Sequence, residues 1–534
     1  MEENTAIQSL PRAESPESVG VRTRAVIDWI EDCKQTGCEI HSFMILRHGK
    51  VAAEVWRKPF RPDVAHTMFS HSKSFSSVAV GFAVEEGLLT PDTRVCELFP
   101  GVGKQNARAR SLTVRHLLTM SSGKMDNPFL FIKKDPDWVL DFLKRNFLSA
   151  PGKKFLYTSA NTYLLCAIVR KVTGQSVTDY LTPRLFEPLG IRRPFWETDP
   201  TRTETGGWGL QIKTEDQAKF IQCCLDGGKW MGRQVIPKSW LDLATVKQID
   251  NAPGTLDNRA GYGFQFWQCH IPNSFRADGL YSQFAIALRD YDACIVINGG
   301  EPEEPKTLET LWRHFPDGFF EGAEAQSPSD REALRQAAEH FDLPSLPERE
   351  RNPRAEQAIE GRTIYLHSRR FASVMGPVNL LLMAKKPGRI NDLKFNFTPE
   401  GLKFSWQEQN SPRNTLLAGM DGQYRTSTIQ LSDMKLTVVS KAAWREDGSL
   451  ELFIRPLELV QARRMVFRFR GKYSRRVRID SRAEHSLRRL ISFYLGFIGM
   501  KSGIKKGMLA RAAGSIGCRL ATPVVDPNLH GKLV

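Results

Sequence analysis

The 534-residue sequence has no long apolar run, no C-x-x-C pair and no cluster of histidines. No stretch of about 18 or more apolar residues is present, so we expect no membrane-spanning helix. The N-terminal segment Met1–Leu10 carries two glutamates and lacks the apolar core of a secretory signal, which favours a cytoplasmic protein. Since neither paired cysteines nor clustered histidines occur, we expect no structural metal and no cofactor.

The nine cysteines are scattered, and their odd number predicts reduced, mostly buried thiols. Positive charge is concentrated at the C-terminal end, where residues 461–534 hold 17 Lys or Arg and 3 Asp or Glu, whereas the whole chain has a net charge of +16. This basic segment, with a short apolar run at 490–500, has three open interpretations: contact with an anionic membrane surface or a partner, RNA binding, or pairing with acidic faces of the protein itself. Nucleic-acid-binding motifs are absent, so we expect no nucleic-acid partner.

The chain is too long for one hydrophobic core, and its character changes along its length. Residues 1–320 show a strand pair around His48-Gly49-Lys50, apolar helical patterns after Ser70 and at 162–173, and strand patterns from Gly261 onward. Strands at both ends with helices between them predict an α+β domain, an antiparallel sheet flanked by helices.

A second domain is predicted beyond a linker. Residues 321–350 are rich in Glu, Ala, Ser and Pro, which indicates the linker. Across 351–480, short alternating runs are separated by turn residues, which predicts an all-β, barrel-like domain. Residues 481–534 form the basic tail.

The candidate nucleophile is Ser70, in the S-x-x-K tetrad Ser70–Lys73 that opens an apolar helix. Residues i and i+3 share a helix face, and a lysine amine whose pKa is lowered by burial can take the proton of a serine hydroxyl. The same spacing occurs at Ser121–Lys124, Ser432–Lys435 and Ser502–Lys505, so the motif alone favours a solvated surface pair. Only the Ser70 tetrad leads directly into a helix that must be buried.

Two histidines near Ser70 raise the alternative of a Ser-His-Asp triad. No G-x-S-x-G elbow surrounds Ser70, so we interpret His66 and His71 as wall or core residues.

Residues 20–315 resemble the β-lactamase-related serine hydrolases, which include class C β-lactamases, D,D-peptidases, family VIII esterases and 6-aminohexanoate-oligomer hydrolases. The resemblance is carried by HTMFSHSKSFSSVAVGFAVEEGLL around Ser70, LTVRHLLTMSSG at 112–123, PGKKFLYTSANTYLLCAIVRKVTG at 151–174 and GGWGLQIKTEDQAKF from Gly206. It implies a β-lactamase/transpeptidase-like fold with an all-helical region beside the sheet.

The resemblance also implies roles for residues distant from Ser70 in sequence. Tyr157 falls on the family's Tyr-x-Asn or Tyr-x-Ser motif and would carry a proton between Ser70 and the leaving group. Ser159 would stand at the third position of that motif, although Asn161 lies only two residues on. Trp208 would contact substrate, with a turn at a helix entry as the alternative.

The family's Lys/His-Thr-Gly motif falls on Ala277-Asp278-Gly279. The resemblance implies that Gly279 lets the backbone approach substrate, and that the N–H groups of Leu280 and Ser70 form an oxyanion hole. A plain hairpin turn is the alternative. Alanine at 277 removes the side chain that binds a substrate carboxylate, which favours ester or amide hydrolysis over β-lactamase or carboxypeptidase activity.

The sequence therefore predicts a serine hydrolase that cleaves an ester or amide bond of a small acyl substrate through an acyl-enzyme on Ser70, with Lys73 and Tyr157 as acid-base groups. Two alternatives are a D-amino-acid peptidase or acyltransferase of the penicillin-binding type and a non-catalytic scaffold on the same fold.

Overall fold

A computed structural model describes residues 9–100, 107–124, 138–144, 146–251, 255–344, 346–366, 373–469, 476–484 and 529–534. The chain folds into two compact units. The first comprises residues 1–57 and 65–341, and the second comprises residues 58–64 and 342–534.

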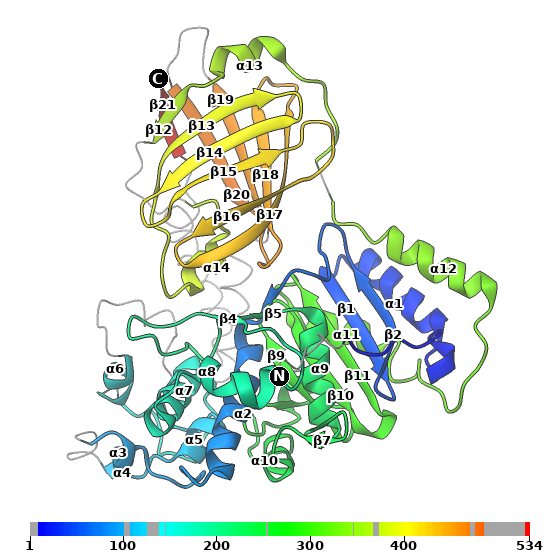
Figure 1. The fold of residues 1–534 in the computed structure, drawn as a ribbon, viewed down its shortest axis with the longest axis vertical. Coiled ribbons are helices and arrows are strands. Elements are labelled where there is room, and N and C mark those ends of the chain that lie inside the picture. The colour runs from blue at the N-terminus through cyan, green and yellow to red at the C-terminus, as the bar shows by residue number, and fades with distance from the viewer. Residues whose placement is uncertain are drawn as a thin grey trace, which may run out of the picture. The chain divides into compact units, whose positions relative to one another are not determined.

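A six-stranded antiparallel sheet forms the centre of the first unit (Figure 1). Its strand order is β2-β1-β11-β10-β9-β8, so the two ends of the domain sequence meet where β1 pairs with β11. The strands are β1 (Ile40–Arg47), β2 (Lys50–Trp56), β8 (Trp267–Gln268), β9 (Ser274–Gly279), β10 (Gln283–Leu288) and β11 (Ala293–Gly299). The predicted α+β sheet is confirmed.

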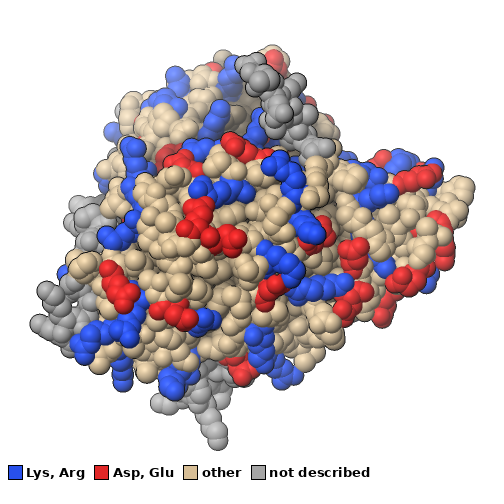
Figure 2. Space-filling model, turned by 60° about the horizontal axis from the view of Figure 1, so that its bottom comes forward, with Lys and Arg blue, Asp and Glu red and all other residues tan. Residues whose placement is uncertain are grey.

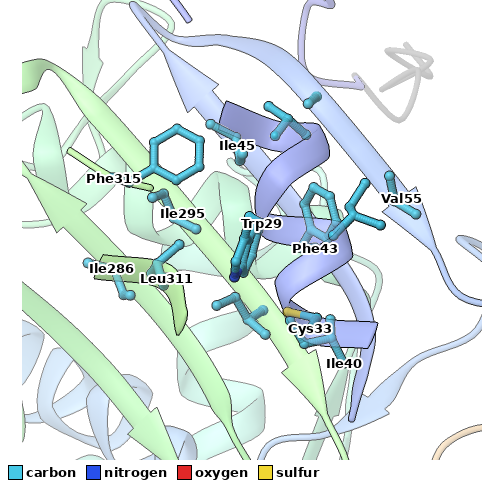
Figure 3. Close-up of a cluster of buried hydrophobic side chains, with 14 of the residues drawn as sticks. Trp29, Cys33, Ile40, Phe43, Ile45, Val55, Ile286, Ile295, Leu311 and Phe315 are labelled. Atoms are coloured by element: carbon cyan, nitrogen blue, oxygen red, sulfur yellow. The ribbon is translucent and has the colours of Figure 1, made fainter. Parts of the chain in front are cut away.

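Helices cover both faces of this sheet, which is why every residue of β1 is buried. On one face, α1 (Thr23–Thr36) and α11 (Glu304–Trp312) bury a cluster around Trp29, which packs on Phe43 with ring centroids 4.7 Å apart (Figure 3). On the other face, α9 (Thr214–Leu225) is joined to the sheet by a hydrogen bond from the Gln217 amide to Asn298.

The stretch 321–350, expected to be a linker, contains a helix, α12 (Pro328–Glu339). The Ser327 hydroxyl caps its N-terminus by accepting the Asp330 N–H at 3.1 Å, and Pro328 occupies its first turn. Ala337 and Phe341 join the Trp29 cluster. The segment is polar in overall composition, but this helix has one apolar face. That face packs on the Trp29 cluster, so the helix is part of the first unit.

Beside the sheet lies a largely helical region centred on α2 (Ser72–Glu85). Twelve of the 14 residues of α2 are buried, so it is a central helix that is covered on all sides. It packs against α7 (Ser159–Thr173). The other helices here are α3 (Val95–Leu98), α4 (Ala107–Arg110), α5 (Val114–Leu118), α6 (Trp138–Lys144), α8 (Val177–Leu181) and α10 (Lys238–Ala244).

Two small sheets complete the first unit. One has the strand order β3-β5-β4, and the other pairs β6 with β7. The strands are β3 (His66–Thr67), β4 (Phe195–Trp196), β5 (Leu210–Ile212), β6 (Lys229–Trp230) and β7 (Arg233–Gln234).

The second unit is a ten-stranded antiparallel sheet that curls into a nearly closed barrel, as predicted (Figure 1). Its order is β15-β14-β13-β12-β21-β20-β19-β18-β17-β16. The two edge strands come together where Asn414 of β15 bonds the backbone of Gln430 in β16 in both directions, at 2.8 and 2.9 Å. Closure of this kind protects sheet edges that would otherwise expose unpaired backbone groups.

Aromatic side chains fill the interior of this barrel, with Phe395, Phe404 and Phe467 in mutual ring contact. The strands are β12 (Thr363–Leu366), β13 (Ile390–Thr398), β14 (Gly401–Glu408), β15 (Arg413–Ala418), β16 (Arg425–Leu431), β17 (Met434–Trp444), β18 (Leu450–Pro456), β19 (Arg463–Phe469), β20 (Arg476–Ala483) and β21 (Leu529–Leu533). Two short helices, α13 (Pro353–Ile359) and α14 (Pro377–Leu382), accompany them.

The segment expected to be a basic tail, 481–534, includes part of this sheet. Strand β21 lies between β12 and β20, so the chain end completes the barrel. The apolar run at 490–500, on which the expected membrane contact depends, lies outside the described residues. In the part of the chain that the structure describes, no helix has both the length and the apolar character needed to span a bilayer.

Positive and negative side chains are mixed on the face of the protein that Figure 2 draws. Figure 2 shows Lys and Arg side chains interspersed with Asp and Glu over that face. The eight cysteines within the described residues are all free, and all but Cys96 are buried, in agreement with the expected reduced thiols.

Candidate active site

Ser70 lies in a single 3-10 turn, Phe69–His71, between β3 and α2. Phe69, directly before it, has a left-handed backbone with φ of 43°, which is sterically costly for a residue with a Cβ. The turn is held in place because Met68 N–H donates to Leu210 O at 2.9 Å. The surrounding contacts maintain this strained conformation of Phe69. It places Ser70 just before α2 with its side chain half-exposed.

Lys73 points back at Ser70 from the first turn of α2. Its Nζ lies 2.8 Å from Ser70 Oγ, 3.0 Å from Ser159 Oγ and 2.7 Å from the carbonyl oxygen of Gly207. The residue is 1% exposed, and this burial lowers the pKa of the ammonium to about 7, while the nearby Asp278 opposes the shift. A lysine in this setting carries a neutral amine in a large share of molecules at neutral pH.

The three contacts of Lys73 match the bonding capacity of a neutral amine. Gly207 O has no hydrogen and can only accept, so one N–H of the amine is directed there. The second N–H can donate to Ser159 Oγ, which leaves the nitrogen lone pair for the hydroxyl proton of Ser70. The arrangement therefore suits proton removal from Ser70.

Tyr157 lies next to this pair, just before α7. Its ring centroid is 4.9 Å from Lys73 Nζ. The ring is half-buried and contacts the rings of Trp267 and Tyr262, at 5.3 and 6.1 Å between centroids. The structure thus brings the predicted phenol of Tyr157, from a distant part of the sequence, together with the hydroxyl and amine of the Ser70–Lys73 tetrad.

The structure favours Ser159 over Asn161 as the family-motif residue. Ser159 is the first residue of α7, and its hydroxyl contacts Lys73. Asn161 is fully buried further along the helix, where its amide contacts Met120 Sδ at 3.6 Å.

Gly207 was not singled out from the sequence. A Cβ at this position would lie 2.6 Å from Ser159 Cβ, so only glycine lets the loop approach α7 closely enough for its carbonyl to reach Lys73. The neighbouring glycines in Gly206-Gly207-Trp208-Gly209 were the available signal. Trp208 itself is buried, and its carbonyl accepts the Trp196 indole N–H at 2.9 Å. Substrate contact by Trp208 stays a prediction.

The end of β9 packs on the backbone that carries Ser70. A Cβ on Gly279 would lie 2.2 Å from Met68 O and 3.1 Å from His71 N, which explains glycine here. Leu280 follows directly and is buried, and the next residues, Tyr281 and Ser282, have left-handed φ of 63° and 66°. The sheet thus ends in a strained turn beside the candidate nucleophile. The oxyanion-hole role of the Leu280 and Ser70 N–H groups stays a prediction.

The two nearby histidines are buried. His66 Nε2 pairs with His41 Nδ1 at 3.0 Å, and its Nδ1 lies 3.2 Å from Thr67 O. His71 is fully buried, neither of its ring nitrogens has a hydrogen-bond partner, and burial lowers its pKa to about 3. A neutral imidazole without partners is a core residue rather than a base for Ser70.

The two other S-x-x-K tetrads within the described residues do not form such a site. Lys124 is buried, but it donates to the carbonyls of Phe142 and Leu143, at 2.7 and 3.1 Å, and so stabilises local backbone. Lys435 is exposed on the barrel, and Ser502–Lys505 lies outside the described residues. Among the residues that the structure describes, no group of three or more His, Cys, Asp or Glu side chains is placed to hold a metal ion.

A serine hydroxyl beside a buried lysine amine, at the start of a helix packed against the end of an antiparallel sheet, defines the class of serine hydrolases that use a Ser–Lys pair. The sequence model of the beta-lactamase family matches residues 30–314, more than half of the chain. The chain therefore belongs to the beta-lactamase family, a family of serine hydrolases.

The chain is also similar to individual proteins. The 6-aminohexanoate-dimer hydrolase of Paenarthrobacter ureafaciens is 27% identical over 258 residues, which cover 45% of this chain and 66% of the relative. Penicillin-binding protein 4* of Bacillus subtilis (strain 168) is 25% identical over 148 residues, 25% of this chain and 31% of the relative. The chain thus spans less than two thirds of either relative. A solved family VIII carboxylesterase is similar with a TM-score of 0.46 and 16% identity, covering 58% of this chain and 99% of the carboxylesterase.

Proposed function

We propose that this protein hydrolyses an ester or amide bond of a small acyl substrate through a covalent acyl-enzyme on Ser70. The observation that carries the proposal is the 2.8 Å contact between Ser70 Oγ and Lys73 Nζ, together with the burial that lowers the pKa of Lys73 to about 7. A hydroxyl is a weak nucleophile until a base takes its proton, and this amine is within reach to do so.

In the acylation step, Ser70 Oγ forms a bond to the substrate carbonyl carbon while its proton moves to the lone pair of Lys73. The N–H groups of Ser70 and Leu280 would hold the resulting oxyanion, a role supported by the close packing of Gly279 on the turn that carries Ser70. The proton then passes to the leaving alcohol or amine through Tyr157, whose ring lies beside Lys73. Breaking the bond to the leaving group gives the acyl-enzyme.

Deacylation repeats these steps with water as the nucleophile. A water molecule gives one proton to Lys73 and attacks the acyl carbonyl, and Ser70 Oγ leaves with a proton returned by the Lys73–Tyr157 pair. No metal or cofactor takes part in this scheme.

Ester or amide hydrolysis is preferred over D-amino-acid peptidase activity because of residue 277. By the resemblance, Ala277, which is small and buried, would occupy the position of the family's cationic or imidazole side chain that binds a substrate carboxylate. The names of relatives include a 6-aminohexanoate-dimer hydrolase and a penicillin-binding protein, so acyl transfer and peptidase activity are the competing outcomes of the test.

A fluorophosphonate probe tests the nucleophile. We expect labelling of the wild type, none of Ser70→Ala, and undiminished labelling of Ser121→Ala, which removes the serine of another S-x-x-K tetrad. An unlabelled wild type would support a scaffold instead. Comparing p-nitrophenyl esters with D-amino-acid p-nitroanilides then separates an esterase or amidase from a peptidase.

We also propose that the protein acts in the cytoplasm. Support comes from the free cysteines, since thiols of this number persist most readily in a reducing compartment.

A further inference from the structure

The last residues of β9 carry a buried ion pair. Arg276 Nε lies 2.9 Å from Asp278 Oδ2, and Arg276 NH1 donates to Gln268 O at 2.7 Å. The side chain of Arg276 is 0% exposed, whereas that of Asp278 is 13% exposed. The carboxylate is therefore the member of the pair that reaches the surface.

A continuous set of contacts links this ion pair to the catalytic side chains. The guanidinium of Arg276 lies over the ring of Trp267, 5.6 Å from its centroid, and Trp267 contacts Tyr157. On the other side, the charge of Asp278 acts on the Lys73 ammonium and raises its pKa against the effect of burial. Asp278 also directly precedes Gly279, the glycine that packs on the backbone of the Ser70 turn.

A second carboxyl group, that of Glu304, lies near this turn but carries little charge at neutral pH, because its pKa is raised. Glu304, at the start of α11, bonds the backbone of Tyr281 in the turn after β9, and burial, followed by the charge of Asp278, raises the pKa of its carboxyl well above the usual value. Arg276 cannot offset the charge of Asp278 for a ligand, because its side chain is enclosed and its Nε and NH1 are already bonded.

We propose that Asp278 is a specificity-determining residue that makes the cleft select acyl substrates with an uncharged or cationic group near the scissile bond and reject those with a carboxylate there. This inference rests on the proposed function, because it names the substrate class of the Ser70 site. Its physical basis is that like charges repel strongly in a partly buried site, where water screens them poorly. Ala277 is uncharged and the Arg276 side chain is enclosed. The charged side chain of β9 that a substrate carboxylate would meet is therefore that of Asp278, which is negative.

The test compares three p-nitrophenyl esters of similar length: the hexanoate, the adipate half-ester and the ω-trimethylammonio hexanoate. For the wild type, we expect kcat/KM of the adipate half-ester to be about tenfold or more below that of the hexanoate. The cationic ester should be at least as good as the hexanoate. Asp278→Asn should raise the adipate-to-hexanoate ratio by about tenfold, since it removes the anion and leaves Arg276 uncompensated.

The matched control is Asp292→Asn, which removes an exposed carboxylate at the β10–β11 turn and should leave the ratio unchanged. If Asp278→Asn does not fold, Arg276→Gln/Asp278→Asn replaces the whole pair by neutral groups and should raise the ratio in the same direction. A wild type that prefers the adipate half-ester, or a ratio that neither variant changes, would overturn the inference while turnover still depends on Ser70. Turnover that survives Ser70→Ala would instead refute the proposed function.

Discussion

The pKa of Lys73 gives a quantitative prediction for acylation. Burial lowers it from the ordinary 10.5 to about 7, a difference that corresponds to about 5 kcal/mol of free energy. At neutral pH about half of the molecules would carry the neutral amine, against roughly one in three thousand for an ordinary lysine. The rate of Ser70 modification should therefore rise about tenfold per pH unit below pH 7 and level off above about pH 8.

The variant Asp278→Asn tests whether the electrostatic environment of Lys73 sets this pH dependence. The charge of Asp278 raises the pKa of Lys73, so its removal should move the midpoint of the pH profile to lower pH. The assay is the second-order rate of fluorophosphonate inactivation from pH 5 to about 10, with Asp292→Asn as the control. A wild-type midpoint near 10, or a midpoint that moves upward in Asp278→Asn, would refute the assignment of Lys73 as the base.

Three further variants test the site. Tyr157→Phe keeps the ring packed on Trp267 but loses the phenol, so kcat should fall about 100-fold with an unchanged melting temperature. Ser159→Ala removes an acceptor of the Lys73 amine and should lower kcat/KM about tenfold, whereas Asn161→Ala should change the melting temperature without moving the pH profile. Lys73→Met should abolish labelling yet raise the free energy of unfolding in denaturant titrations at pH 6, because a buried ammonium destabilises the folded state below its folded pKa; that contribution fades as pH rises from about 7 to 10.5. Equal or lower stability of Lys73→Met at pH 6 would contradict the burial argument.

Periodic features of the fold were predictable from the sequence. The helix after Ser70 and the strands at both ends of the first domain follow from apolar spacing, since burial of one face imposes that spacing locally. The barrel strands followed from alternation in the same way.

The missed features depend on contacts between distant segments. The carbonyl of Gly207 reaches Lys73 because a loop packs on α7, and no periodic pattern encodes that approach. The Arg276–Asp278 ion pair could not be predicted, because the burial of Arg276 depends on how β8 pairs with β9. Strand β21 was predicted to be part of the tail, because five residues are too few to show a clear alternation of apolar and polar side chains. Its place in the barrel is set by pairing with β12 and β20.

The central claim is that Ser70 becomes acylated during turnover. The most direct measurement is to quench the protein in acid while it hydrolyses a p-nitrophenyl ester and to locate the added acyl mass by peptide mapping. We expect the acyl group on the peptide that contains Ser70, and none in Ser70→Ala. Steady ester hydrolysis by the wild type with the acyl group on another residue would contradict it.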